Sequence, residues 1–321
     1  MVLTKGDAGD AELCGQLHSV AAAGEQGCEH LLVRPGWAAA AGTGLPVDVG
    51  RVQERDARVY RLVEGPAGVG KTELAKAVAS ATKAELIRLQ CYEGVDEARA
   101  LYEWNHAKQL LRITAAGAHH DSAGADEADW TSVKEDIFTD EFLLSRPLLT
   151  AIRNEHPTVL LIDELDKADV EIEGLLLEVL SDFQVTVPEL GTIRASQTPF
   201  VVLTSNATRE LSEALRRRCL YLHIDYPESD LELRIVRLTV PDLDETLAAS
   251  VVRLVGALRD MRLRKSPSVA ETIDWARTLV SLGTDGELQP ELVRSTLGVV
   301  LKHREDIELA VQTLDLDRAL A

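Results

Sequence analysis

The stretch Gly65-Pro66-Ala67-Gly68-Val69-Gly70-Lys71-Thr72 fits the phosphate-binding loop pattern G-x-x-x-x-G-K-[ST] at every fixed position. Residues 58–63 before it predict a strand, and residues 73–80 after it carry apolar side chains at helical spacing. The glycines let backbone N–H groups surround a phosphate, and the helix N-terminus adds its positive dipole. We expect Lys71 to reach the β- and γ-phosphates and Thr72 to bind Mg²⁺. The loop predicts nucleotide binding, but by itself it does not predict hydrolysis.

A second motif supplies carboxylates. Residues 158–164 read TVLLIDE, an uncharged run rich in branched side chains that ends in Asp163 and Glu164. Such a run predicts a strand buried on both faces, with its acids at the carboxyl edge of the sheet, where α/β proteins bind ligands. Hydrolysis needs a bound metal and a group that orients water. We expect Asp163 to hold Mg²⁺ directly or through water, Glu164 to act as base, and Asn206, which ends the apolar strand 200–206, to position the water. The alternative for the acid pair is a solvated strand end.

The order of the remaining segments predicts an α/β fold, a parallel sheet with helices on both faces, followed by a helical domain. We expect three parts: an N-terminal segment 1–57 with weak or no order, a nucleotide-binding domain 58–226, and a helical lid domain 227–321. The predicted strands are 58–63, 84–90, 158–163, 200–206 and 219–224, with a hairpin over 183–195. The predicted helices are 73–80, 141–155 (interrupted or starting near Pro147), 170–182, 210–218, 228–238, 244–261, 268–282, 290–303 and 305–314.

Composition limits the classes of partner. The chain has 321 residues and a formal net charge of −19, which opposes binding to a nucleic-acid backbone. The four cysteines lack C-x-x-C spacing, so the sequence predicts neither a zinc site nor a disulfide framework. His119-His120-Asp121 lies in a polar stretch, 114–132, that we interpret as a solvated loop. Without a long apolar run or a signal segment, we expect a cytoplasmic protein with no membrane partner.

The order of the motifs resembles that of AAA+ ATPases. Residues 65–72 are followed by 160–164 (LLIDE), 202–206 (VLTSN), 216–219 (RRRC) and then the helical domain. More narrowly, the chain is similar to the MoxR family. Residues 91–111, an excursion after the second strand, resemble the helix-2 insert of that clade, and residues 184–195 resemble its pre-sensor hairpin. Three segments resemble the MoxR-type ATPases associated with maturation of carbon-monoxide-dehydrogenase-like molybdenum hydroxylases: 89–94 (LQCYEG), 189–194 (ELGTIR) and 271–276 (ETIDWA).

The resemblance implies roles for residues of this chain. Lys71 and Thr72 match the Walker A motif, Asp163 and Glu164 match Walker B, and Asn206 matches sensor 1. Arg218 best matches an arginine finger that acts on the neighbouring subunit, with Arg217 as the near alternative. The resemblance therefore implies ATP and Mg²⁺ as cofactors and a ring, usually hexameric. It also implies a protein client, a metalloenzyme, and a partner with a von Willebrand factor A domain.

Two departures from the family pattern keep alternatives open. Residues 1–57 do not show the helices that usually help to hold the base, and Ser268, Val269 and Ala270 occupy positions where the lid arginine, sensor 2, is expected. One alternative is therefore a nucleotide-binding scaffold with impaired hydrolysis. A nucleic-acid motor of related fold is a further alternative, which the acidic composition disfavours.

Overall fold

The computed structural model describes residues 60–117, 136–284, 286 and 288–313. The predictions for residues 1–57, for most of the loop 114–132 and for His119-His120-Asp121 lie outside this part of the chain. Within it the chain forms two compact units. One consists of the described parts of 60–62 and 78–221, and the other of 63–77 and 222–313. The domain boundaries at residues 57/58 and 226/227 stay predictions.

A five-stranded parallel sheet flanked by helices confirms the predicted fold class. Its strand order is β2-β5-β8-β1-β9. Strand β5, between β2 and β8, is buried along its whole length, which explains its run of branched apolar residues. In the register, Gln90 of β2 lies beside Asp163 of β5, and Ile162 lies beside Leu203 of β8. The strands are β1 (Tyr60–Glu64), β2 (Glu85–Gln90), β5 (Thr158–Asp163), β8 (Phe200–Ser205) and β9 (Cys219–His223).

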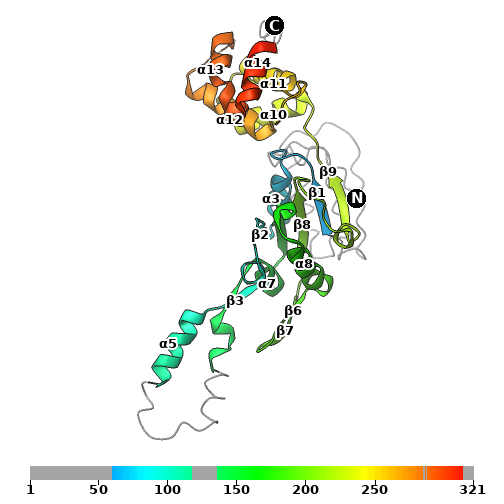
Figure 1. Ribbon diagram of the computed structural model, residues 1–321, viewed down its shortest axis with the longest axis vertical. Coiled ribbons are helices and arrows are strands. Elements are labelled where there is room, and N and C mark those ends of the chain that lie inside the picture. Colours follow the sequence, from blue (N-terminus) through cyan, green and yellow to red (C-terminus); the bar gives the residue numbers. More distant parts are fainter. Residues whose placement is uncertain (1–59, 118–135, 285, 287, 314–321) are drawn as a thin grey trace. The chain divides into compact units, whose positions relative to one another are not determined.

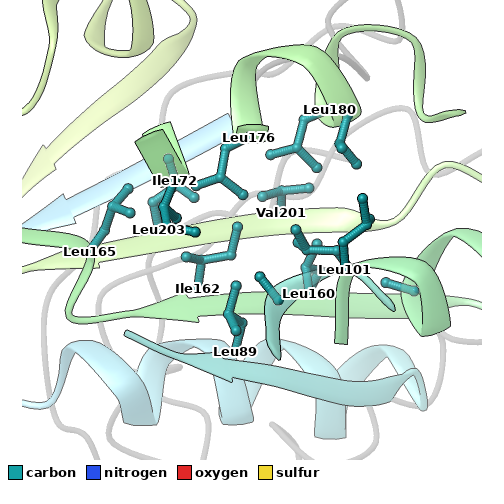
Figure 2. Close-up of a cluster of buried hydrophobic side chains, with 14 of the residues drawn as sticks. Leu89, Leu101, Leu160, Ile162, Leu165, Ile172, Leu176, Leu180, Val201 and Leu203 are labelled. Atoms are coloured by element: carbon teal, nitrogen blue, oxygen red, sulfur yellow. The ribbon is translucent and has the colours of Figure 1, made fainter. Parts of the chain in front are cut away.

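Helix α8 (Val170–Asp182) packs its apolar stripe on this sheet. Figure 2 shows Ile172, Leu176 and Leu180 directed at Val201 and Leu203 of β8, and all five side chains are buried. The spacing of the three α8 residues is that of one helix face, as the sequence predicts. The other helices of this part are α3 (Lys71–Thr82), α7 (Pro147–Arg153) and α9 (Glu213–Arg216), together with the short 3₁₀ helix η4 (Leu165–Lys167).

An excursion separates β2 from α7, and a hairpin separates α8 from β8. The excursion contains a two-stranded antiparallel sheet of β3 and β4, and helix α5 extends from it away from the main sheet (Figure 1). The hairpin of β6 and β7 pairs Val185 with Ile193, as predicted. The bounds are α4 (Glu97–Ala100), β3 (Tyr102–Trp104), α5 (His106–Gly117), η3 (Asp140–Phe142), β4 (Leu143–Ser145), β6 (Gln184–Val187) and β7 (Gly191–Arg194).

Two predicted helices are shorter in the structure. The helix predicted over 141–155, interrupted or starting near Pro147, starts at Pro147 as α7, and η3 and β4 occupy the residues before it. Proline disfavours helical backbone in the residue before it, and Arg146 is extended, with φ −99° and ψ 175°. The helix predicted over 210–218 is reduced to α9, so Arg218 lies beyond its end.

The C-terminal region is helical, as predicted, and its helices form a bundle (Figure 1). Trp275 is completely buried in the core of the bundle, and its Nε1 donates to Thr296 Oγ1 at 2.9 Å. This hydrogen bond satisfies the polar atom that the buried indole carries. The helices are α10 (Ser229–Thr239), α11 (Glu245–Arg259), α12 (Val269–Ser281), α13 (Pro290–Val300) and α14 (Arg304–Thr313).

Candidate functional site

The phosphate-binding loop follows β1 and leads into α3. Gly68 and Gly70 have φ of 73° and 97°, which side chains rarely adopt. At Gly65 a Cβ atom would lie 1.9 Å from the carbonyl oxygen of Ile224, so the backbone approaches too closely for any larger residue. The glycines of the motif are therefore needed for this loop conformation.

Lys71 folds over the loop that precedes it. Its Nζ donates to the carbonyl oxygens of Gly65 at 2.8 Å and Pro66 at 2.6 Å, and the residue is buried. Thr72 is the second residue of α3. The ammonium group thus lies at the loop whose backbone N–H groups would surround a phosphate, where an anion would attract it strongly.

The first residues of α12 lie against the same loop. A Cβ atom on Gly68 would be 2.2 Å from Ser268 Oγ and 3.4 Å from Ala270 Cβ. Ser268 and Glu271 form a reciprocal capping box at this helix start. The position where the family resemblance expects an arginine therefore holds small residues in close contact with the loop.

The two acids at the end of β5 have different backbone conformations. Asp163 ends β5 and is buried, whereas Glu164 adopts a left-handed conformation with φ 56° and ψ 46°. Thr204 links them, because its hydroxyl donates to Asp163 Oδ1 and accepts from the Glu164 N–H at 2.9 Å. Glu164 Oε2 accepts from Gln90 Nε2 at 3.0 Å and from Lys167 Nζ at 2.5 Å. The strand ends of β2, β5 and β8 thus meet at these acids.

Asp166 connects the acid motif with the turn that contains Asn206. Its carboxylate accepts from the backbone N–H of Asn206 at 3.0 Å, and from the N–H and hydroxyl of Thr208 at 3.1 and 2.5 Å. Burial alone would raise the pKa of Asp166, but these hydrogen bonds together lower it below the ordinary value of 3.8. Ala207, between the two donors, has φ 57°. Asp166 thus stabilises a strained turn beside Glu164.

The three consecutive arginines make different contacts. Arg218 Nη1 donates to Ser181 Oγ at 3.0 Å on α8, and Arg217 pairs with Glu213 at 2.8 Å. The guanidinium of Arg216 lies 5.4 Å from the ring centroid of Tyr221. Both Arg217 and Arg218 are exposed, so each is accessible to another molecule.

Comparison with known families identifies the architecture. Residues 61–226 match the family model described as "ATPase family associated with various cellular activities (AAA)". This match covers the sheet with the phosphate loop, the acid pair and Asn206. The chain belongs to the AAA family of ATPases.

Relatives of this AAA chain differ in the share of their length that matches. An uncharacterized protein of Staphylococcus epidermidis is 25% identical over 252 residues, which cover 76% of this chain and 84% of that protein. An ATP-dependent Clp protease ATP-binding subunit ClpA homolog of Porphyra purpurea is 31% identical over 155 residues, 47% of this chain and 15% of that protein. The solved structure of the Thermotoga maritima RuvB Holliday junction branch migration motor is 17% identical, with a TM-score of 0.44, and covers 97% of this chain and 77% of that one.

The phosphate loop and the acid pair each carry residue types that suit a nucleotide with its magnesium ion. The positive-φ glycines shape a cradle of backbone N–H groups, and Lys71 adds a cation. Thr72 in the loop and Asp163 at the end of β5 each carry an oxygen atom of the kind that Mg²⁺ prefers as a ligand. Among the described residues no group of three or more His, Cys, Asp and Glu side chains could hold a separate metal ion.

Sequence reasoning missed five residues that contact the acids or the Asn206 turn: Arg88, Gln90, Asp166, Lys167 and Thr204. Thr204 stands inside the quoted motif 202–206 (VLTSN), and Asp166 follows the acid pair two residues later, in 163–166 (DELD). Arg88 and Gln90 are alternate residues of β2 and therefore share one face of the strand. This spacing can be seen in the sequence, but it predicts contacts with the acids only once β2 is known to lie next to β5.

Proposed function

We propose that this AAA protein hydrolyses ATP with Mg²⁺ and uses the energy to remodel a protein client. The observation that carries the proposal is the Thr204 hydroxyl, which joins Asp163 to Glu164 beside the Asn206 turn. The loop 65–72 and the acid pair each follow a strand of one parallel sheet. The carboxyl ends of such strands are where α/β sheets bind ligands.

Each residue has a separate task in the proposed reaction. Asp163 and Thr72 would hold Mg²⁺, which would supply positive charge to the phosphates when bound. Glu164 accepts a proton from water while the water oxygen bonds to the γ-phosphorus and the bond to the bridging oxygen breaks, which yields ADP and phosphate. The contacts of Glu164 with Gln90 and Lys167 both fall on Oε2, so within the described residues Oε1 can face the water. Asn206 orients that water, and Lys71 stabilises the phosphate oxygens.

The proposed active unit is a ring, with a hexamer as the expected size. Arg218 would complete the site of the neighbouring subunit, and Arg217 is the alternative. The exposure of both guanidinium groups supports a role outside their own subunit. Arg218 is held by Ser181 and by the carbonyl oxygen of Leu177, so α8 orients it.

The proposed subfamily is MoxR, acting in the cytoplasm on a metalloenzyme client with a von Willebrand factor A-domain partner. Two features support this proposal: the excursion of β3, α5 and β4 follows β2, and the hairpin of β6 and β7 follows α8, where the resemblance expects a helix-2 insert and a pre-sensor hairpin. Cys91 and Cys219, the cysteines within the described residues, are free, which agrees with a reducing compartment, and burial raises the pKa of each to about 12. Every described helix is too short or too polar to span a bilayer.

The test is phosphate release by the purified full chain with ATP, in Mg²⁺ and in excess EDTA, together with native mass spectrometry. The proposal expects Mg²⁺-dependent release and a ring-sized species with ATP. A folded protein that binds ATP but releases no phosphate would instead be a scaffold. Salt-sensitive binding to DNA would point to a nucleic-acid motor.

A further inference from the structure

The proposed magnesium ligand already has a cation beside it. Arg88 Nη2 donates to Asp163 Oδ2 at 2.6 Å, while Thr204 donates to Oδ1. The side chain of Asp163 is 3% exposed, whereas that of Arg88 is 47% exposed. A buried carboxylate is therefore paired with a guanidinium that keeps much of its contact with water.

This asymmetry determines which partner can leave. A buried charge without a partner is strongly unfavourable, so Asp163 requires a countercharge whenever no metal is bound. Arg88 keeps nearly half of its surface in water and can rotate away while remaining hydrated. A divalent cation at Asp163 would supply the countercharge and would repel the guanidinium at this short distance.

We propose that Arg88 is a metal-competing residue, which neutralises Asp163 in the nucleotide-free protein and is displaced when Mg²⁺ binds with nucleotide. This inference rests on the proposed function, because it takes Asp163 as a ligand of the magnesium ion. Arg88 therefore lowers the affinity of the site for a divalent ion and stabilises the protein that lacks one.

The contacts of Arg88 extend to Glu164. Its guanidinium also donates to Gln90 Oε1, and Gln90 Nε2 donates to Glu164 Oε2 at 3.0 Å. Departure of Arg88 therefore removes one of the contacts that hold Gln90 against Glu164. Metal binding at Asp163 would thus change the surroundings of the general base as well.

The experiment measures binding of Mn²⁺ to the full chain by electron paramagnetic resonance, with saturating ADP. Arg88→Gln removes the charge, and Arg88→Lys is the matched control that keeps it. Arg88→Gln should bind Mn²⁺ about tenfold more tightly than wild type, and Arg88→Lys should stay near wild type. Thermal melting adds a second readout, in which Arg88→Gln is less stable than wild type without metal and equal to it with Mg²⁺ and ADP. Arg88→Met, which keeps the apolar stem, replaces Arg88→Gln if the latter does not fold.

Each contrary outcome has a distinct meaning. Two results would overturn the inference and leave the proposed function standing: unchanged or weaker Mn²⁺ binding by Arg88→Gln, or an equal loss of stability without metal and with Mg²⁺ and ADP. Either result would mean that the ion pair of Arg88 with Asp163 is only structural. A wild-type protein that binds no Mn²⁺ with ADP would overturn both the inference and the proposed metal site. If Arg88→Lys also bound Mn²⁺ more tightly than wild type, the charge of residue 88 could not be what weakens metal binding, and the inference would be overturned.

Discussion

Replacing Thr204 by valine should separate the positioning of Glu164 from the packing of β8. The two side chains have nearly the same shape, so no cavity forms in this buried strand, but valine cannot hydrogen-bond. The substitution removes the hydrogen bond to Asp163 Oδ1 and leaves the Glu164 N–H without its partner. A hydrogen bond to a charged group contributes about 1.5–3 kcal/mol, and an unsatisfied buried donor costs about 1–3 kcal/mol. We therefore expect the free energy of unfolding to fall by about 2.5–6 kcal/mol.

The effect on turnover should be separate from the loss of stability. A displacement of a reacting group by 1 Å can cost about 10²-fold in rate, so Thr204→Val should lower kcat by about that factor per folded molecule. ATP affinity should change little, because the phosphate loop is intact. Thr204→Ser keeps the hydroxyl and should recover most of the rate, with a cost near 0.8 kcal/mol for the lost methyl group. Urea unfolding and phosphate release on the three proteins measure both quantities. Wild-type stability and turnover in Thr204→Val would refute the positioning role.

Three further predictions address the other parts of the site. Lys71→Ala should weaken ATP binding about ten- to a hundredfold in a fluorescent-nucleotide titration, because it removes a charge-assisted contact to phosphate; unchanged affinity would contradict the assignment of the loop. Asp166→Asn should lose about 1–3 kcal/mol of stability at pH 7, because an amide cannot accept all three hydrogen bonds. Since the folded-state pKa of Asp166 is lowered, its carboxylate stabilises the fold above the ordinary pKa of 3.8, and this stabilisation is lost as the pH falls below that value. The free energies of unfolding of Asp166→Asn and wild type should therefore become equal in acid. A difference in stability that stays constant with pH would contradict the role of the Asp166 carboxylate. Arg218→Ala should lower turnover about 10³- to 10⁵-fold with ATP affinity intact, and mixing it with Lys71→Ala subunits should restore activity; no recovery in rings of proven mixed mass would count against a shared site.

The fold class and the principal motifs were readable because local sequence determines them. The uncharged run 158–162 predicts the fully buried strand β5, and the apolar spacing of α8 predicts which face of that helix is buried. The absence of an arginine at the start of α12 is also visible in the sequence, whereas the capping box of Ser268 and Glu271, although local, was not predicted.

The features that sequence reasoning missed depend on contacts between distant segments. Arg88 and Asp163 are 75 residues apart, and they meet because β2 pairs with β5, an adjacency that no local pattern specifies. Strand β4, which occupies part of the predicted segment 141–155 before Pro147, was missed for the same reason, since it forms by pairing with β3. The apolar residues before Pro147 have helical spacing, but the pairing with β3 and the proline at residue 147 favour a strand there.

The central claim, that Glu164 activates water for ATP hydrolysis, is tested most directly by single-turnover hydrolysis in Glu164→Gln. The amide keeps the size of the side chain and much of its hydrogen bonding but cannot accept the proton. The claim predicts nucleotide affinity near that of wild type, phosphate release reduced to background, and ATP recovered unhydrolysed from the isolated protein. Release of phosphate by Glu164→Gln at the wild-type rate would contradict it.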